Sequence, residues 1–298
     1  MNKDVPDGDA AIRYYDGDYP SLEIGDPQAG QVVQLERMGI LGDVGFYKEL
    51  AARAGGPVLE AGCGTGRLTI PLARMGLEVW AVDVSAGMLA RLRARLDGED
   101  AAVRARVHVV QQDAARLDLP ERGFALALLP FNTLMLIPDP DEERATLAAM
   151  AAHMAPGAAL ALDVMNPLTL PLEADRTPAP SAPRTAPDSG NRYVRYAMHT
   201  ALDALRRQLV CGWYDELLPD GTVRSTDFAF RWRMIFRPEM DSMLCGAGFA
   251  AETLAGDFDG TEWTPESRRM VVTARLISVK ASKPGLCKVR RNGIETGS

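Results

Sequence analysis

The stretch that most constrains the fold runs from Val58 to Arg67 and reads VLEAGCGTGR. A short apolar run leads directly into three glycines at alternate positions, and apolar residues at helical spacing follow. The glycines are Gly62, Gly64 and Gly66. Because glycine has no Cβ, such a turn lets the backbone approach a ligand closely. The stretch therefore predicts a strand, a tight turn at a ligand and a helix.

The glycine spacing distinguishes between classes of ligand. Dinucleotide-binding turns read G-x-G-x-x-G, and P-loops end in G-K-[ST]. Here the pattern is E-x-G-x-G-x-G, beginning at Glu60, and no lysine follows. The spacing disfavours a nicotinamide-dependent dehydrogenase. On this motif alone, a turn of purely structural use is the alternative.

Two acidic residues follow at the ends of apolar strands. Asp83 ends the strand predicted at 78–84, and Asp113 ends the strand predicted at 107–114. A single aspartate at a strand end is most often a turn residue, but an acid at the second strand can accept hydrogen bonds from both hydroxyls of a ribose. Ser85 is the predicted N-cap of the next helix. Two acids in this order after the glycine motif predict a nucleoside site.

Taken in order, Glu60, the three glycines, Asp83 and Asp113 resemble the signature of class I, Rossmann-like S-adenosylmethionine-dependent methyltransferases. The group most alike is that of bacterial small-molecule N- and O-methyltransferases. The resemblance covers residues 57 to about 277 and is specific in the first half of that range. It implies an α/β fold with a Rossmann-like, seven-stranded, mostly parallel sheet and helices on both faces. It also implies S-adenosyl-L-methionine as cofactor and S-adenosyl-L-homocysteine as product.

The resemblance further implies the residues that contact the cofactor, and it places Asp113 beside the adenine amino group. Cys63 is common at its place in the motif and carries no implied reactivity. The implied cofactor-binding residues are Tyr15, Glu60, Gly62, Cys63, Gly64, Gly66, Arg67, Asp83, Val84, Met88, Asp113, Ala114, Pro130 and Phe131.

The chain divides into four parts. Residues 1–56 form an N-terminal helical segment, whose Tyr-Asp stretch resembles a lid over the cofactor; a surface helix is the alternative. Residues 57–165 and 237–277 form the cofactor-binding core. Between them, 166–236 are an insertion after the fifth strand: a proline-rich loop over 166–191, in which we expect no regular element, and three antiparallel strands. Residues 278–298 form a flexible tail.

The inserted antiparallel sheet is rich in aromatic residues, which suits two uses. It walls the acceptor pocket, or it forms a homodimer contact. Arg231 and Arg233 alternate with Trp232, so one face is predicted to be basic and the other apolar. A carboxylate-bearing acceptor would suit the basic face, although a solvated sheet face is the commoner explanation.

Three residues are candidates for the methyl-transfer step: Tyr14, Asn132 and His199. Asn132 ends the nearly continuous apolar run at 124–132, which predicts a central strand; it lies at the ligand edge of the sheet, or it merely caps the next turn. His199 is the one histidine placed near an acceptor pocket, but a histidine in a sheet is more often structural. Methyl transfer depends mainly on proximity and alignment, and an amine needs no general base, whereas a hydroxyl does. The lack of a convincing base favours N-methylation, with O-methylation as the alternative.

Composition disfavours several other classes of protein. The net charge of −7 disfavours a nucleic-acid substrate. No apolar run approaches the roughly 18 residues of a membrane span, and the polar start lacks a secretion signal. The four scattered cysteines form no C-x-x-C pair, and no metal-ligand cluster is present, so we predict a cytoplasmic, metal-independent protein. A non-catalytic domain that binds the cofactor and serves a partner is the remaining alternative.

Overall fold

A seven-stranded sheet forms the core of the computed structural model, which describes residues 12–24 and 29–277. The strands lie in the order β11-β12-β5-β4-β1-β2-β3, and β12 is the one antiparallel member. This confirms the predicted fold class. The strands are β1 (Val58–Ala61), β2 (Val79–Asp83), β3 (Val107–Gln111), β4 (Phe124–Leu129), β5 (Met154–Met165), β11 (Phe249–Ala255) and β12 (Arg269–Leu276).

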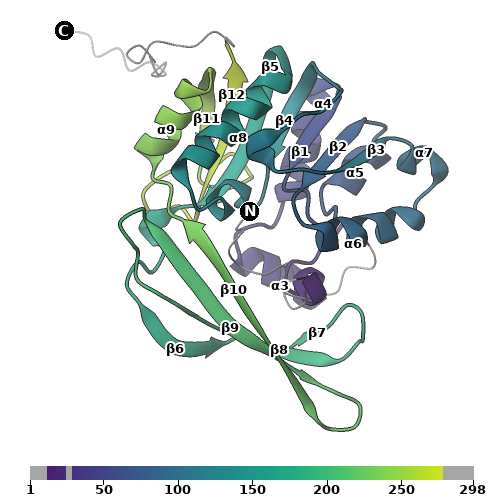
Figure 1. Cartoon of the computed structure of the whole chain (residues 1–298), viewed down its shortest axis with the longest axis vertical. Coiled ribbons are helices and arrows are strands. Elements are labelled where there is room, and N and C mark those ends of the chain that lie inside the picture. Colours follow the sequence, from purple (N-terminus) through teal and green to yellow (C-terminus); the bar gives the residue numbers. More distant parts are fainter. Residues whose placement is uncertain (1–11, 25–28, 278–298) are drawn as a thin grey trace.

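Helices cover both faces of this sheet (Figure 1). The helices are α2 (Tyr15–Asp18), α3 (Ala29–Arg37), α4 (Asp43–Ala54), α5 (Thr69–Arg74), α6 (Ala86–Asp97), α7 (Ala101–Arg104), α8 (Pro140–His153) and α9 (Arg237–Gly246), with short 3-10 turns η1 (Ala114–Arg116), η2 (Thr133–Leu136) and η3 (Pro167–Thr169). Their starts follow local rules: Ser85 accepts a hydrogen bond from the Met88 amide, and Asp139 accepts one from the Asp141 amide. Pro140 then occupies the first position of α8.

The central strands are buried on both sides, which explains their nearly continuous apolar sequence. In β4, Ala127 and Leu129 pack in the cluster that contains α8 and α9. Leu126 and Leu128 pack in the opposite cluster, which contains α4 and α5. Alternate residues of one strand therefore hold two helical layers, and the carboxyl ends of the strands remain for a ligand.

The inserted sheet has the order β10-β9-β8-β6, and β7 also pairs with β8. It extends away from the core in Figure 1. The strands are β6 (Asp175–Pro180), β7 (Arg184–Thr185), β8 (Arg192–His199), β9 (Arg207–Leu217) and β10 (Val223–Arg233). Three antiparallel strands were expected over 192–236, but β6 and β7 lie in the stretch for which no regular element was expected. Prolines are tolerated there because β6 and β7 pair on one side, with β8 alone.

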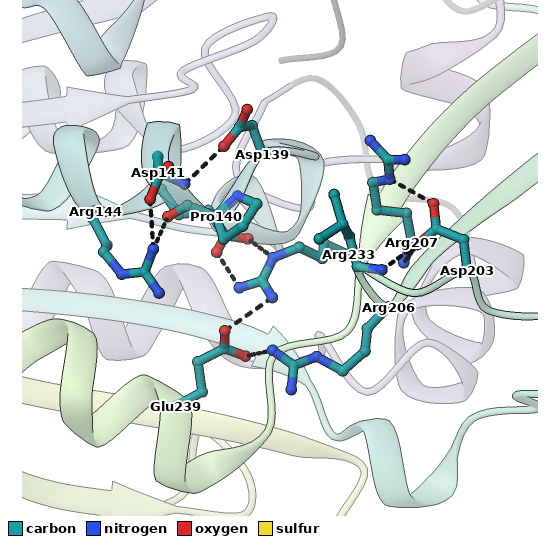
Figure 2. A network of polar contacts seen from close by, with 11 residues as sticks. Asp139, Pro140, Asp141, Arg144, Asp203, Arg206, Arg207, Arg233 and Glu239 are labelled. Atoms are coloured by element: carbon teal, nitrogen blue, oxygen red, sulfur yellow. Dashed lines mark hydrogen bonds and ion pairs between the residues drawn. The ribbon is translucent and has the colours of Figure 1, made fainter.

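A buried arginine anchors the inserted sheet to the core. Arg233, at the end of β10, donates a 2.8 Å hydrogen bond from Nε to Glu143 of α8 and a 3.0 Å one from Nη1 to Glu239 of α9. Figure 2 shows Arg233 and Arg206 converging on Glu239. The Arg233 side chain is 1% exposed, so the predicted basic face does not extend to it: Arg233 is a paired residue of the sheet–core junction.

The N-terminal segment lies between the core and the inserted sheet. The Asp18 carboxylate, which is buried, accepts 2.8 Å hydrogen bonds from the hydroxyls of Tyr193 and Tyr214 in the inserted sheet. On the core side, Asp16 accepts a 2.7 Å hydrogen bond from the hydroxyl of Thr65 in the glycine turn. The segment therefore links the two sheets. The predicted tail at 278–298 lies outside the described residues.

Candidate active site

A cavity opens at the carboxyl ends of β1, β2 and β4, where the strand order reverses beside β1. One half is formed by the glycine turn and the strand ends. Tyr15 and Tyr19 of the N-terminal segment also line the cavity. The inserted sheet forms the other half through side chains on one of its faces: Arg195, Tyr214, Phe228, Phe230 and Trp232.

Two glycines of the turn have different reasons to be glycine. Gly64 has φ +55°, and a Cβ there would lie 3.6 Å from the Tyr15 hydroxyl, on the cavity side. Gly66 has φ +85°, and a Cβ there would lie 2.3 Å from Leu92 of α6. The lack of a side chain at Gly64 therefore leaves space in the cavity, whereas the lack of one at Gly66 lets the turn pack against α6.

Asp83 holds the turn in place. Its two carboxylate oxygens accept 2.9 Å hydrogen bonds from the amides of Gly64 and Ser85. The residue is 5% exposed and lines the cavity. A carboxylate oxygen has room for a second hydrogen bond, so Asp83 supports the turn and still presents an acceptor to a ligand.

Glu60 is a buried acid beneath the turn, 1% exposed. Burial raises the pKa of Glu60 to about 7, although a 2.6 Å hydrogen bond from the Thr69 hydroxyl and the charge of Arg67 act in the opposite direction. Its charge thus changes near neutral pH, and a nearby cationic ligand would favour the ionised form.

Arg67 lies between the turn and Phe131. Both terminal nitrogens of Arg67 bind the carboxylate of Asp43 in α4, and its guanidinium carbon lies 5.2 Å from the centroid of the Phe131 ring.

Two tyrosines of the N-terminal segment also line the cavity. Burial raises the pKa values of Tyr15 and Tyr19, so both phenols stay protonated near neutral pH.

The turn after β4 is held by a buried acid. Phe131 and Asn132 have φ of +53° and +62°, a rare pair for residues other than glycine. The amide of Phe131 donates a 2.7 Å hydrogen bond to Asp163 of β5, and Arg269 of β12 pairs with the same carboxylate. Arg269 also donates a 2.8 Å hydrogen bond to Asn132 Oδ1. The strained turn is therefore fixed from two neighbouring strands.

The described residues contain no group of three or more histidine, cysteine, aspartate or glutamate side chains that could hold a metal ion. Over the same ranges, no helix combines the length and apolar character needed to cross a membrane.

Comparisons with known proteins match this geometry. Residues 58–157 match a protein family described as a methyltransferase domain. The cypemycin N-terminal methyltransferase of Streptomyces sp. is 28% identical over 235 residues, covering 78% of this chain and 87% of that protein. The CcbJ methyltransferase from Streptomyces caelestis has a similar structure, with a TM-score of 0.68 and 26% identity over 91% of this chain and 98% of that one. The chain is a class I S-adenosylmethionine-dependent methyltransferase.

CalS10, an amino pentose methyltransferase from Micromonospora echinaspora solved with S-adenosylmethionine bound, shares the fold of this methyltransferase. The TM-score is 0.60 at 21% identity, over 84% of this chain and 97% of that one. The cofactor is S-adenosylmethionine, and the donor set fits it. Three carboxylates line the half of the cavity formed by the core, which suits a ligand with two cationic groups and a ribose: Glu60, Asp83 and Asp113.

The methyltransferase cavity brings together most of the predicted site residues. Those that line it are Tyr15, Glu60, Gly62, Cys63, Gly64, Arg67, Asp83, Val84, Met88, Asp113, Ala114, Pro130, Phe131 and Asn132. Gly66, Tyr14 and His199 are not among the lining residues. The Tyr14 hydroxyl donates a 2.7 Å hydrogen bond to Glu216, and His199 Nδ1 lies 3.2 Å from Gln208 Nε2.

Sequence reasoning missed part of the methyltransferase site. Tyr19 and Arg195 line the cavity, and Asp163 and Arg269 fix the turn that carries Phe131. The strand pattern placed Asp163 and Arg269 in strands but gave no sign that they pair. Arg195 is one charged residue in a strand of alternating polarity. Because any solvated sheet face shows this pattern, the sequence did not indicate that Arg195 lines a cavity.

Proposed function

We propose that this methyltransferase transfers the methyl group to a nitrogen atom of a small-molecule acceptor. The supporting observation is the composition of the cavity half that the inserted sheet forms. Its walls are the aromatic face of the inserted sheet and the tyrosines of the N-terminal segment, so a small acceptor is surrounded by side chains. Enclosure of this kind suits a small molecule better than a protein side chain.

When bound, S-adenosylmethionine supplies a sulfonium-bound methyl group, whose transfer forms the new carbon–nitrogen bond and breaks the carbon–sulfur bond. The residues of this chain bind and align. We propose that Asp83 accepts hydrogen bonds from the ribose hydroxyls and that Asp113 lies beside the adenine. Gly64 allows close approach of the backbone. Phe131, fixed by Asp163, forms a rigid wall at the junction of the two halves.

Nitrogen as the attacked atom is supported by the lack of a suitable base. The described residues that line the cavity include no histidine, and its three carboxylates, Glu60, Asp83 and Asp113, lie in the half formed by the core, where we propose that the cofactor binds. Tyr15 and Tyr19 have pKa values raised by burial, so they remain protonated, and Asn132 Oδ1 already accepts hydrogen bonds from Arg269 and the Met165 amide. A neutral amine attacks without a base, whereas a hydroxyl would need one.

The test has two stages. Calorimetric titration with S-adenosylhomocysteine and with NAD should show binding of the first alone. Methyl-labelled cofactor is then offered with a panel of small amines and with matched alcohols and phenols. Label in amines alone supports the proposal. Label in the hydroxyl compounds alone would replace it with O-methylation, and label in neither set would remove the small-molecule assignment.

Two expectations about the whole protein remain predictions. A homodimer through the inserted sheet would use the face opposite the cavity, where the rings of Tyr196 and Trp213 stack with centroids 5.0 Å apart. Sedimentation of wild type and of Trp213→Ala tests it, because a dimer built there should dissociate in the variant. The second expectation that remains a prediction is a cytoplasmic location.

A further inference from the structure

Arg195 is a cavity-lining cation on the aromatic face of the inserted sheet. It lies in β8, its side chain is 19% exposed, and its guanidinium carbon lies 4.4 Å from the centroid of the Phe228 ring. A guanidinium stacked in this way keeps its N–H groups in its own plane, where they can bind a planar anion.

The nearest acid does not satisfy this guanidinium. Arg195 Nε lies 3.9 Å from Asp18 Oδ2, which is beyond hydrogen-bond distance. Asp18 already accepts hydrogen bonds from Tyr193 and Tyr214 and is paired with Arg184. Among the residues that the structure describes, Arg195 Nε has no hydrogen-bond partner. Two guanidinium groups therefore share one carboxylate, and the cluster has a surplus of one positive charge.

A largely buried surplus charge of this kind is costly unless it is paired. The carboxylates that line the cavity belong to the glycine turn and the strand ends of the core: Glu60, Asp83 and Asp113. The inserted-sheet half instead offers two arginines, Arg195 and Arg231, of which Arg195 lies on the aromatic face with Phe228, Phe230 and Trp232. Arg67 also lines the core half, but Asp43 neutralises it, so the cavity is acidic at the core and basic at the inserted sheet. A guanidinium fork is complementary to a carboxylate, which it binds through two parallel hydrogen bonds.

We infer that Arg195 binds a carboxylate of the acceptor, so the acceptor is a small amine that also carries a carboxylate group, such as an amino acid. This rests on the proposed function, because it places the acceptor in the inserted-sheet half of the cavity. The amino-acid tail of the cofactor has a carboxylate too, and the experiment separates the two sources.

The probe is phenylacetate, compared with its neutral isostere phenylacetamide, titrated into protein saturated with S-adenosylhomocysteine. Wild type should bind phenylacetate more tightly by roughly ten- to a hundredfold, the effect expected for a charge-assisted hydrogen bond. Arg195→Gln should lose this preference, and Arg195→Lys should keep part of it. Arg192→Gln is the matched control: Arg192 lies on the same strand, exposed, and an odd number of residues away, so its side chain is on the other face.

Each other outcome overturns the inference. Equal binding of the two probes by wild type, or an equal preference in Arg195→Gln and Arg192→Gln, would remove Arg195 from carboxylate recognition. If Arg195→Gln weakens S-adenosylhomocysteine but not 5′-methylthioadenosine, the carboxylate belongs to the cofactor. Failure of wild type to bind S-adenosylhomocysteine would overturn the proposed function itself. If Arg195→Gln does not fold, Arg195→Lys takes its place: a preference for phenylacetate smaller than that of wild type and of Arg192→Gln supports the inference, and an equal preference overturns it.

Discussion

Gly64 and Gly66 belong to one motif, and we expect the first to matter mainly for cofactor binding and the second mainly for folding. In Gly64→Ala, the new Cβ touches Tyr15 at ordinary contact distance, so the cost to folding is mainly left-handed strain of about 1–2 kcal/mol. The methyl group enters the cavity, and S-adenosylhomocysteine affinity should fall at least about tenfold. Gly66→Ala forces Leu92 to move and should lower the melting temperature more. Calorimetry and thermal melts of both variants measure this. Normal binding by Gly64→Ala would show the glycine-turn assignment to be wrong.

Glu60 makes the stability of the folded protein depend on pH. Its folded-state pKa of about 7 lies above the ordinary value of 4.5, so the folded state holds the extra proton between these values. Stability from this group therefore falls as pH rises from about 4.5 to about 7, by on the order of 3 kcal/mol.

Glu60→Gln removes this dependence. We expect the variant to be more stable than wild type at pH 8 and similar to it at pH 4, as measured by urea unfolding. Its affinity for the cationic cofactor should also lack the rise with pH that an ionising Glu60 gives wild type between pH 6 and 8. A constant difference in unfolding free energy between the two proteins from pH 4 to pH 8 would contradict the raised pKa of Glu60.

At the scale of elements, the turn after β4 depends on the Asp163–Arg269 pair between β5 and β12. Arg269→Met leaves the fully buried Asp163 carboxylate without its cation, and we expect a loss of about 3–5 kcal/mol. Cofactor affinity should fall as well, because Asp163 also holds the Phe131 turn.

The control is Arg268→Met, at an exposed neighbouring position that bonds backbone carbonyls of α3. Adding Asp163→Asn to Arg269→Met should recover part of the stability, because it removes the unpaired charge. Denaturant unfolding of wild type, Arg269→Met, Asp163→Asn and the double variant completes the double-mutant cycle. A loss below about 1 kcal/mol in Arg269→Met would mean that the pair does not hold the turn.

The elements that sequence alone could predict are those with local causes. The strand–turn–helix at Val58 to Arg67, the Ser85 cap and the β8–β10 meander follow from periodicity, capping and turn residues. Strand β6 could not be predicted, because its prolines are tolerated only through its place at a sheet edge. The Asp163–Arg269 pair and the links of Asp18 to the inserted sheet join residues far apart in sequence, and no local pattern carries that information.

At the scale of the molecule, the N-terminal segment joins the two sheets through a small number of polar contacts. Tyr193→Phe removes the hydroxyl that bonds the buried Asp18 and should cost about 1.5–3 kcal/mol. It should also increase amide exchange in β8–β10. Tyr196→Phe is the control on the same strand, because its ring stacks on Trp213 on the opposite face. Equal melting temperatures for the two variants would show that the bridge does not stabilise the protein.

The position of the insertion has a consequence for engineering. Everything that the second sheet contributes to the cavity comes from one continuous stretch, between β5 and α9, whereas the core residues that we propose bind the cofactor lie outside it. Transplanting this segment from a related enzyme is thus one route to a different acceptor preference. The transplant would fail if it came alone, because Asp18 and Tyr14 are matched to Tyr193, Tyr214 and Glu216. A working chimera must exchange the N-terminal residues together with the sheet.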